Sequence, residues 1–142
     1  MAADDGLAAL AETLASPSPS LRMRALEVLC EFSAERATPV VIELIHDPDP
    51  AVRSAAARAA ARIRSTRAVG SLIVALDDPD AGMRRSSAEA LQSIVGGEVE
   101  VDDEPDAEQR RRRQAELKRW WKERRFAELA TSTQGSGHEP TT

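Results

Sequence analysis

The sequence predicts an all-α protein, an α-solenoid of about three 31-residue helical hairpins followed by a C-terminal capping helix. The first observation is composition: Ala, Leu, Arg and Glu, which favour helices, are abundant in the 142 residues, and only 3% of the chain is aromatic. The second is an internal repeat, because the sequence matches itself without gaps when it is shifted by 31 residues. Hairpins of this length cannot bury their apolar faces alone, so successive units must stack.

The repeat is clearest where the three units begin, at residues 16, 47 and 78. A proline follows each of these residues, and an arginine stands six positions after each of them. Ser18-Pro19 and Asp49-Pro50 are typical of helix N-termini, because proline at the first helical position loses no hydrogen bond. We therefore expect the first helix of each unit over residues 19–33, 50–64 and 81–95.

Each unit also contains a second helix with its own apolar positions. Thr38-Pro39 is a further cap-and-proline pair, so this helix is expected over residues 38–45, with counterparts over 5–15 and 67–77.

Along the first helices of the three units, one repeat position carries charges of alternating sign. The stacked helices would bring these charges close together, and the alternation avoids repulsion. The residues at this position are Glu27, Arg58 and Glu89.

Residues 47–53 and 67–76 together resemble the HEAT repeat, and more narrowly the short bacterial HEAT-like type grouped with phycobilisome lyases. The resemblance covers residues 5–96 and implies a right-handed α-solenoid that serves as an interaction scaffold. It also implies a structural ladder of aspartates and arginines between neighbouring units, in which Ser18 replaces the first aspartate. The ladder residues would be Asp49, Asp80, Arg22, Arg53 and Arg84.

Charge divides the C-terminal part of the chain into distinct segments. One stretch has six acidic residues and no basic ones, and the next has nine basic and four acidic residues. The final stretch is poor in apolar residues and is expected to be disordered. The predicted organisation is a repeat solenoid over residues 1–97, an acidic linker over 98–106, a basic helix over 107–130 and a disordered tail over 131–142.

Leu117, Trp120 and Trp121 of the basic helix are predicted to cap the solenoid. Without a cap, the last unit would expose an apolar edge to water. Leu117 and Trp121 lie four residues apart and share a helix face, so Trp121 is expected to be more buried than Trp120.

Another protein is the expected partner, and the outward positions of the second helices are the expected binding surface. Three of these positions are apolar, although solvent-facing residues are usually polar. Alternatively, neighbouring helices or the C-terminal helix cover them. The predicted partner-binding residues are Val40, Glu43, Leu44, Ser71 and Val74.

The basic helix supports a second hypothesis, the binding of nucleic acid or of an acidic partner through residues 107–125. Its arginines and lysines could contact phosphates, and Trp120 or Trp121 could stack on a base. The acidic linker could instead neutralise this charge within the chain, which makes nucleic acid the less favoured partner. The family resemblance adds a third hypothesis, an accessory subunit similar to a bilin lyase.

No set of residues predicts catalysis, cofactor binding or metal binding, and the sequence therefore indicates a non-enzymatic protein. Cys30 is the only cysteine, and neither His46 nor His138 has a nearby second ligand. No apolar run is long enough to span a membrane, and no basic region marks a signal peptide at the N-terminus. We expect a cytoplasmic location without membrane contact.

Overall fold

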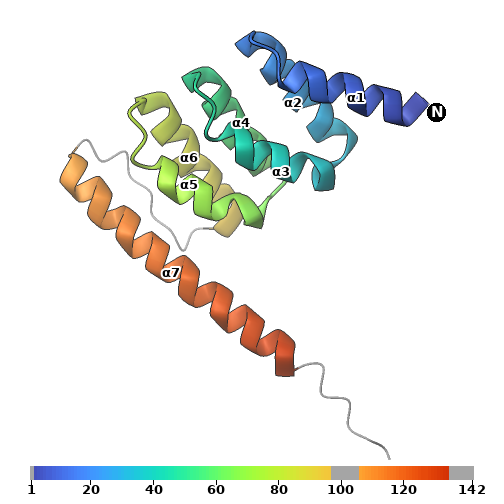
Figure 1. Cartoon of the computed structure of the whole chain (residues 1–142). Coiled ribbons are helices and arrows are strands. Elements are labelled where there is room, and N and C mark those ends of the chain that lie inside the picture. Colours follow the sequence, from blue (N-terminus) through green and yellow to red (C-terminus); the bar gives the residue numbers. More distant parts are fainter. Residues whose placement is uncertain (1, 97–105, 135–142) are drawn as a thin grey trace, which may run out of the picture.

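A computed structural model describes residues 2–96 and 106–134, and helices form almost all of this part of the chain (Figure 1). The all-α architecture predicted from the sequence is confirmed, and the helices pack in chain order. The elements are α1 (Ala2–Leu14), α2 (Pro19–Phe32), α3 (Ala34–Leu44), α4 (Pro50–Arg62), the 3₁₀ turn η1 (Thr66–Ala68), α5 (Val69–Ala75), α6 (Ala81–Val95) and α7 (Ala107–Gln134).

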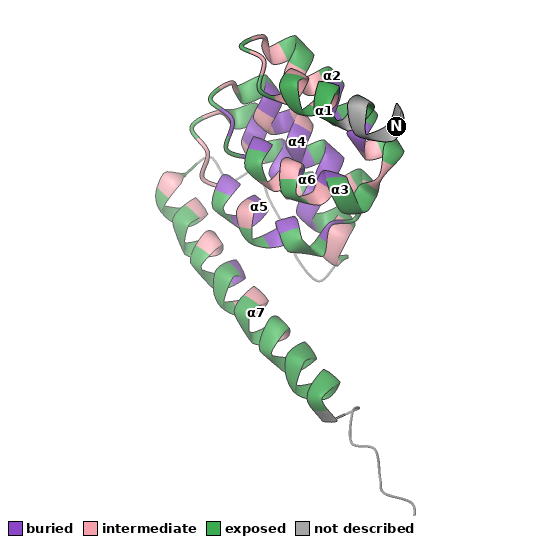
Figure 2. Cartoon of the chain, turned by 45° about the vertical axis from the view of Figure 1, so that its right-hand side comes forward, coloured by how far each residue is buried: buried purple, intermediate pink, exposed green. Residues whose placement is uncertain are grey.

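Two rows of helices make up the solenoid. The first row consists of α2, α4 and α6, which pack on one another in succession. The second row consists of α1, α3 and α5: α1 packs on α2, α3 packs on α2 and α4, and α5 packs on α6. The buried side chains lie between the rows (Figure 2). Ala56, Ala57 and Ala60 are fully buried, and their small size lets neighbouring first-row helices approach closely.

Aspartates cap two of the three first-row helices, α4 and α6, whereas Ser18 at the start of α2 makes no side-chain cap hydrogen bond. One carboxylate oxygen of Asp49 accepts hydrogen bonds from the backbone N–H groups of Ala51 (2.8 Å) and Val52 (3.3 Å). Asp80 accepts a bond from the backbone N–H of Met83 at 2.8 Å. These N–H groups have no partner within the helix, so the caps stabilise its first turn. All three first-row helices begin where the repeat pattern predicts.

The second-row helices differ from the sequence prediction in their bounds. α3 begins four residues earlier than predicted, because Ser33 accepts a hydrogen bond from the backbone N–H of Arg36 (3.2 Å) and caps the helix there. Pro39 therefore lies inside α3, where it removes one backbone hydrogen bond. The last second-row helix is shorter than predicted, since it consists of η1 and the seven residues of α5.

α7 is a single helix of 28 residues whose C-terminal half extends beyond the solenoid (Figures 1 and 2). Asp106 caps its start by accepting a hydrogen bond from the backbone N–H of Glu108 at 2.8 Å. The rest of the predicted acidic linker lies outside the described residues.

The prediction of a disordered tail is wrong for residues 131–134, because α7 continues through them. Thr131, Ser132 and Thr133 donate hydroxyl hydrogen bonds to backbone carbonyl oxygens one helical turn earlier, at 2.8 to 2.9 Å. Back-bonding of this kind satisfies short polar side chains inside a helix. Residues 135–142 lie outside the described part of the chain.

α7 packs on α5 and runs antiparallel to it. Gln114, near the start of α7, contacts carbonyl groups at the C-terminal end of α5. Trp121 and Arg125, further along α7, lie beside Gly70 near the N-terminal end of α5. A helix that continued the repeat would run parallel to α5, so α7 closes the second row rather than extending it.

Candidate protein-binding surface

Two arginines join neighbouring units of the solenoid through paired hydrogen bonds. Arg22 donates from Nε and Nη2 to the two carboxylate oxygens of Asp47, both at 2.9 Å. Arg53 repeats this geometry with Asp78 at 3.0 and 3.1 Å. The hydrogen bond with Asp47 raises the pKa of Arg22 above its usual value. Each bidentate pair fixes the position of one unit on the next.

The acidic members of this ladder are not the ones predicted from the family resemblance. Asp49 and Asp80 cap helices, so their carboxylates are engaged at helix N-termini. Asp47 and Asp78, each two residues earlier, bind the arginines of the preceding unit instead. The repeated Asp-Pro-Asp sequence could have revealed this division, because the capping rule assigns only the second aspartate of each pair.

Arg84 ends the ladder. Its Nη1 donates to the carbonyl oxygens of Asp78 at 2.8 Å and Pro79 at 3.2 Å, just as Arg53 binds the corresponding carbonyl oxygens of its own unit. Its buried Nε atom has no hydrogen-bond partner in the part of the chain that the structure describes. Within the described residues, Arg84 therefore lacks the bidentate carboxylate contact that its two counterparts make.

The predicted partner-binding residues of the second row are only partly exposed. Glu43 and Val74 occupy the same repeat position, and both are exposed. Val40 and Ser71 occupy another and are half-buried. Leu44 is buried in the core, as is the residue at its repeat position in the next unit. That position points toward neighbouring helices, so the prediction that Leu44 faces outward is wrong.

α7 covers the end of the second row with one face. Leu117 is buried in the core, and the half-buried Trp120 and Trp121 pack against it. The two indole rings lie 6.0 Å apart, and the guanidinium carbon of Arg124 lies 5.3 Å from the centroid of the Trp120 ring. The three predicted capping residues thus lie on the face of α7 that meets the core, and both tryptophans are half-buried.

A groove of about 340 Å³ runs between α5 and α7. Its floor is largely apolar, and it extends along the part of α7 that lies beyond the solenoid. There Phe126 is 62% exposed and Leu129 is 60% exposed. Three cationic side chains line the groove on the wall formed by α7. The residues that line the groove are Gly70, Ile73, Lys118, Trp121, Lys122, Arg125, Phe126 and Leu129.

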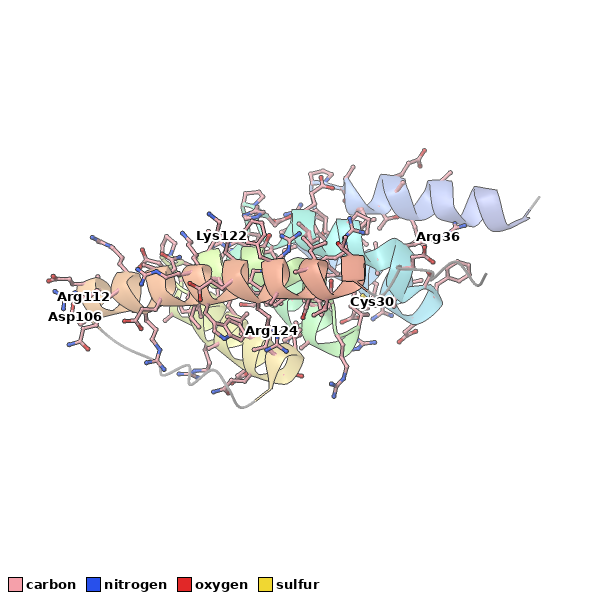
Figure 3. The ribbon with its side chains drawn as sticks, turned by 90° about the horizontal axis from the view of Figure 1, so that it is seen from below. Cys30, Arg36, Asp106, Arg112, Lys122 and Arg124 are labelled. Carbon is pink, nitrogen blue, oxygen red and sulfur yellow. The ribbon has the colours of Figure 1, made fainter. Side chains whose placement is uncertain are left out.

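A second hollow of about 440 Å³ lies on the other side of Trp121, next to the C-terminal end of α6. Gly70, Trp121 and Arg125 line both hollows. A Cβ atom at Gly70 would meet no atom within 4 Å, so there is open space beside the indole. Figure 3 shows Lys122 and Arg124 at opposite edges of α7, where each faces a different hollow.

The basic residues of α7 form two groups. Near its start, Arg110 and Arg111 approach Asp77 at 3.5 and 3.7 Å, and Arg112 donates to Glu108 at 2.9 Å. These three arginines, which belong to the basic residues predicted to contact phosphates, are therefore partly neutralised by nearby acids. Further along α7, positive charge gathers beside the groove.

The described residues offer little for metal binding or nucleophilic chemistry. Among residues 2–96 and 106–134, no group of three His, Cys, Asp or Glu side chains could hold a metal ion. Burial raises the pKa of the Cys30 thiol, although Arg62 acts in the opposite direction, and such a thiol is a poor nucleophile at neutral pH. No helix in this part of the chain is long and apolar enough to cross a bilayer.

The stacked hairpins and their arginine–aspartate ladder define a helical-repeat protein. The family description of HEAT repeats matches residues 7–92, more than half of the chain. The chain belongs to the HEAT repeat family, as the resemblance in its sequence indicated. HEAT repeats are generally scaffolds for protein interactions and are typically not catalytic. Neither a curated protein nor a solved structure matches the chain.

Proposed function

We propose that the protein is a scaffold that binds an acidic, amphipathic helical segment of a partner protein in the groove between α5 and α7. The observation that carries the proposal is the exposure of Phe126 and Leu129 beside a row of cations. Large apolar side chains that stay exposed on a highly charged helix are typical of a surface that another protein covers. Membership of a family of interaction scaffolds supports the same class of function.

The spacing of the cations favours a helical ligand. Lys118, Lys122 and Arg125 are four and three residues apart, so they form a row about 10 Å long on one side of α7. A partner helix could place apolar side chains against Trp121 and Phe126 while its acidic residues face this row. The apolar contacts would supply most of the affinity, and the charge pairs would mainly determine partner choice and association rate.

The exposed residues of the second row extend the proposed surface. α5 forms one wall of the groove and also carries Ser71 and Val74. Val74 lines a further hollow of about 470 Å³ at the unit boundary, and Val40 and Glu43 lie on α3, the preceding second-row helix. We place the centre of the contact in the groove because the largest exposed apolar side chains of this region lie there.

Fluorescence anisotropy with two labelled synthetic peptides tests this function. One peptide is an amphipathic helix with leucines on one face and glutamates on the other, and its matched control carries lysines in place of the glutamates. We expect the acidic peptide to bind at least about tenfold more tightly than the basic one. Labelled duplex DNA serves as a third probe, and binding of DNA in preference to the acidic peptide would favour the nucleic-acid hypothesis instead.

Substitutions then test whether the groove is the binding site. Phe126→Glu places a charge on the apolar floor and should weaken binding of the acidic peptide by about tenfold or more, while Lys122→Glu should weaken it less. Arg58→Glu reverses an exposed charge on α4, a first-row helix outside the proposed surface, and should leave the affinity unchanged. Equal binding of the two peptides, or full affinity in Phe126→Glu, would contradict the proposal.

A further inference from the structure

α2 carries a line of exposed apolar side chains at the opposite end of the solenoid from the groove. Leu21 is 50% exposed, Val28 is 46% exposed and Phe32 is 63% exposed. Residues spaced by seven and four positions lie on one side of a helix, so the three side chains form a strip about 16 Å long. Three large apolar residues in one strip differ from singly scattered surface residues, which need no explanation.

The repeat shows what this strip is built to contact. In the next two units the position of Leu21 is occupied by Val52 and Met83, and both are fully buried. The position of Val28 is occupied by alanines, which are also buried. α4 packs on α2 and α6 packs on α4, whereas no first-row helix precedes α2 in the described chain. The strip is therefore a first-row packing face without its neighbouring helix.

We propose that a second copy of this chain covers the strip, so that the two α2 helices pack antiparallel about a two-fold axis close to Val28. In this arrangement Leu21 of each copy lies near Phe32 of the other. Such an isologous contact closes after two copies and leaves the groove between α5 and α7 accessible in each. The proposal goes beyond the binding of a partner segment and uses a different surface.

Charge complementarity on α2 supports a second copy in this orientation. Arg24 and Glu31 are exposed and lie on the same flank of the strip, because seven residues make about two helical turns. An antiparallel pair keeps this flank of both helices on one side of the contact and brings Arg24 of each copy near Glu31 of the other. A parallel pair would place the two flanks on opposite sides and form neither ion pair.

The same reasoning disfavours head-to-tail stacking, in which α6 of one copy packs on α2 of the next. Glu89 of α6 occupies the repeat position of Glu27 on α2, so this stack would bring two like charges together. Arg85 and Gln92 of α6 occupy the repeat positions of Ser54 and Ala61 of α4. Both Arg85 and Gln92 are exposed and polar. Among the described residues, this face of α6 is thus polar, whereas the strip on α2 is apolar.

Sedimentation velocity of the full chain tests the proposal. The strip is smaller than the roughly 800 Å² per partner of a standard interface, so we expect reversible dimers with a dissociation constant in the micromolar range. The mass should rise with concentration from 15.4 kDa toward twice that value and should not exceed it. A monomer at all concentrations up to about 300 µM, or a mass that grows beyond the dimer, would overturn the proposal.

Two phenylalanines of nearly equal exposure provide a matched pair of variants. Phe32→Glu should raise the dissociation constant of the dimer by about tenfold or more and leave binding of the acidic peptide intact. Phe126→Glu should leave the dissociation constant of the dimer unchanged and weaken binding of the acidic peptide by about tenfold or more. Dimerisation that survives Phe32→Glu overturns the α2 interface, and the two readouts separate its failure from failure of the groove.

Charge exchange and cross-linking test the antiparallel orientation. Arg24→Glu and Glu31→Arg should each weaken the dimer, and the double exchange should restore it, because both ion pairs are then rebuilt with reversed sign. In a Cys30→Ala background, Val28→Cys should form an intermolecular disulfide with itself, since the axis passes close to it. Failure of the double exchange to restore the dimer, or failure of Val28→Cys to cross-link, would overturn the orientation.

Discussion

The side-chain amide nitrogen of Gln114 lies 2.8 Å from the backbone carbonyl oxygen of Val74 and 3.1 Å from that of Ile73. The last carbonyl groups of a helix lack the usual partner one turn further along. Those of Ile73 and Val74 accept bonds from the backbone N–H groups of Leu76 at 3.2 Å and Asp77 at 3.4 Å, and the amide of Gln114 adds a second donor to each. With Arg110 beside Asp77, this contact fixes the start of α7 at the C-terminal end of α5. It therefore sets the antiparallel direction of α7, which creates the groove.

Replacement of Gln114 tests this attachment. Gln114→Glu removes the donor and places a carboxylate against two carbonyl oxygens, so we expect it to lower the free energy of unfolding by about 2 kcal/mol. Gln114→Leu only removes the hydrogen bonds and should cost about 1 kcal/mol. Urea denaturation followed by circular dichroism measures both. If the two variants were equally stable, the amide would not be anchored to α5 as described.

The ladder predicts unequal effects of equivalent arginines. Arg53→Met leaves the largely buried carboxylate of Asp78 without its bidentate partner, and we expect a loss of about 3 kcal/mol of stability. Arg84→Met removes contacts to two carbonyl oxygens but strands no carboxylate, so its cost should be about 1 kcal/mol. Thermal and urea unfolding of the two variants should preserve this order, and a larger loss for Arg84→Met would contradict the ladder.

The capping role of α7 can be measured with leucines on its two faces. Leu117 is part of the core, so Leu117→Ala should destabilise the protein by about 2 to 4 kcal/mol. Leu129 is exposed, and Leu129→Ala should change stability by less than about 0.5 kcal/mol. Truncation before α7 should lower the melting temperature further and promote association of the uncovered ends. An unchanged melting temperature after truncation would show that α7 is no cap.

The thiol of Cys30 should react slowly with iodoacetamide at neutral pH. Burial raises its pKa, so the neutral thiol persists to higher pH in the folded state than in the unfolded state. Because burial disfavours the thiolate only in the folded state, the free energy of unfolding is at its full value below the unfolded-state pKa. It falls as the pH rises from there through the folded-state pKa. Alkylation rates measured by mass spectrometry should keep increasing at pH values where a free thiol has levelled off. A rate profile equal to that of a free thiol would contradict the burial.

The first-row helices and the core between the rows could be predicted because the repeat imposes the same burial on equivalent residues. Val52 and Met83 show this, since both are buried at one repeat position. The sequence also predicted that Leu117 would meet the solenoid. A periodic pattern is informative wherever each unit has a neighbour on both sides.

The errors arose where one residue type could serve two purposes or where the repeat ends. Asp47 and Asp49 are both close to a helix start, and only the engagement of Asp49 as a cap leaves Asp47 to bind Arg22. Leu44 is apolar on a face that the helix period alone assigned to solvent, and tertiary packing buries it. The antiparallel direction of α7 depends on contacts with α5 that no periodicity records, so the sequence does not predict the groove.

Nuclear magnetic resonance of the ¹⁵N-labelled full chain, titrated with the acidic amphipathic peptide, tests the proposed binding groove most directly. We predict that the largest shifts occur at the backbone amides of Gly70, Ile73, Lys122 and Phe126, and that the amide of Arg58 on α4 does not move. Largest shifts at residues 110–113, or on α2 and α3, would contradict the assignment of the groove as the binding site.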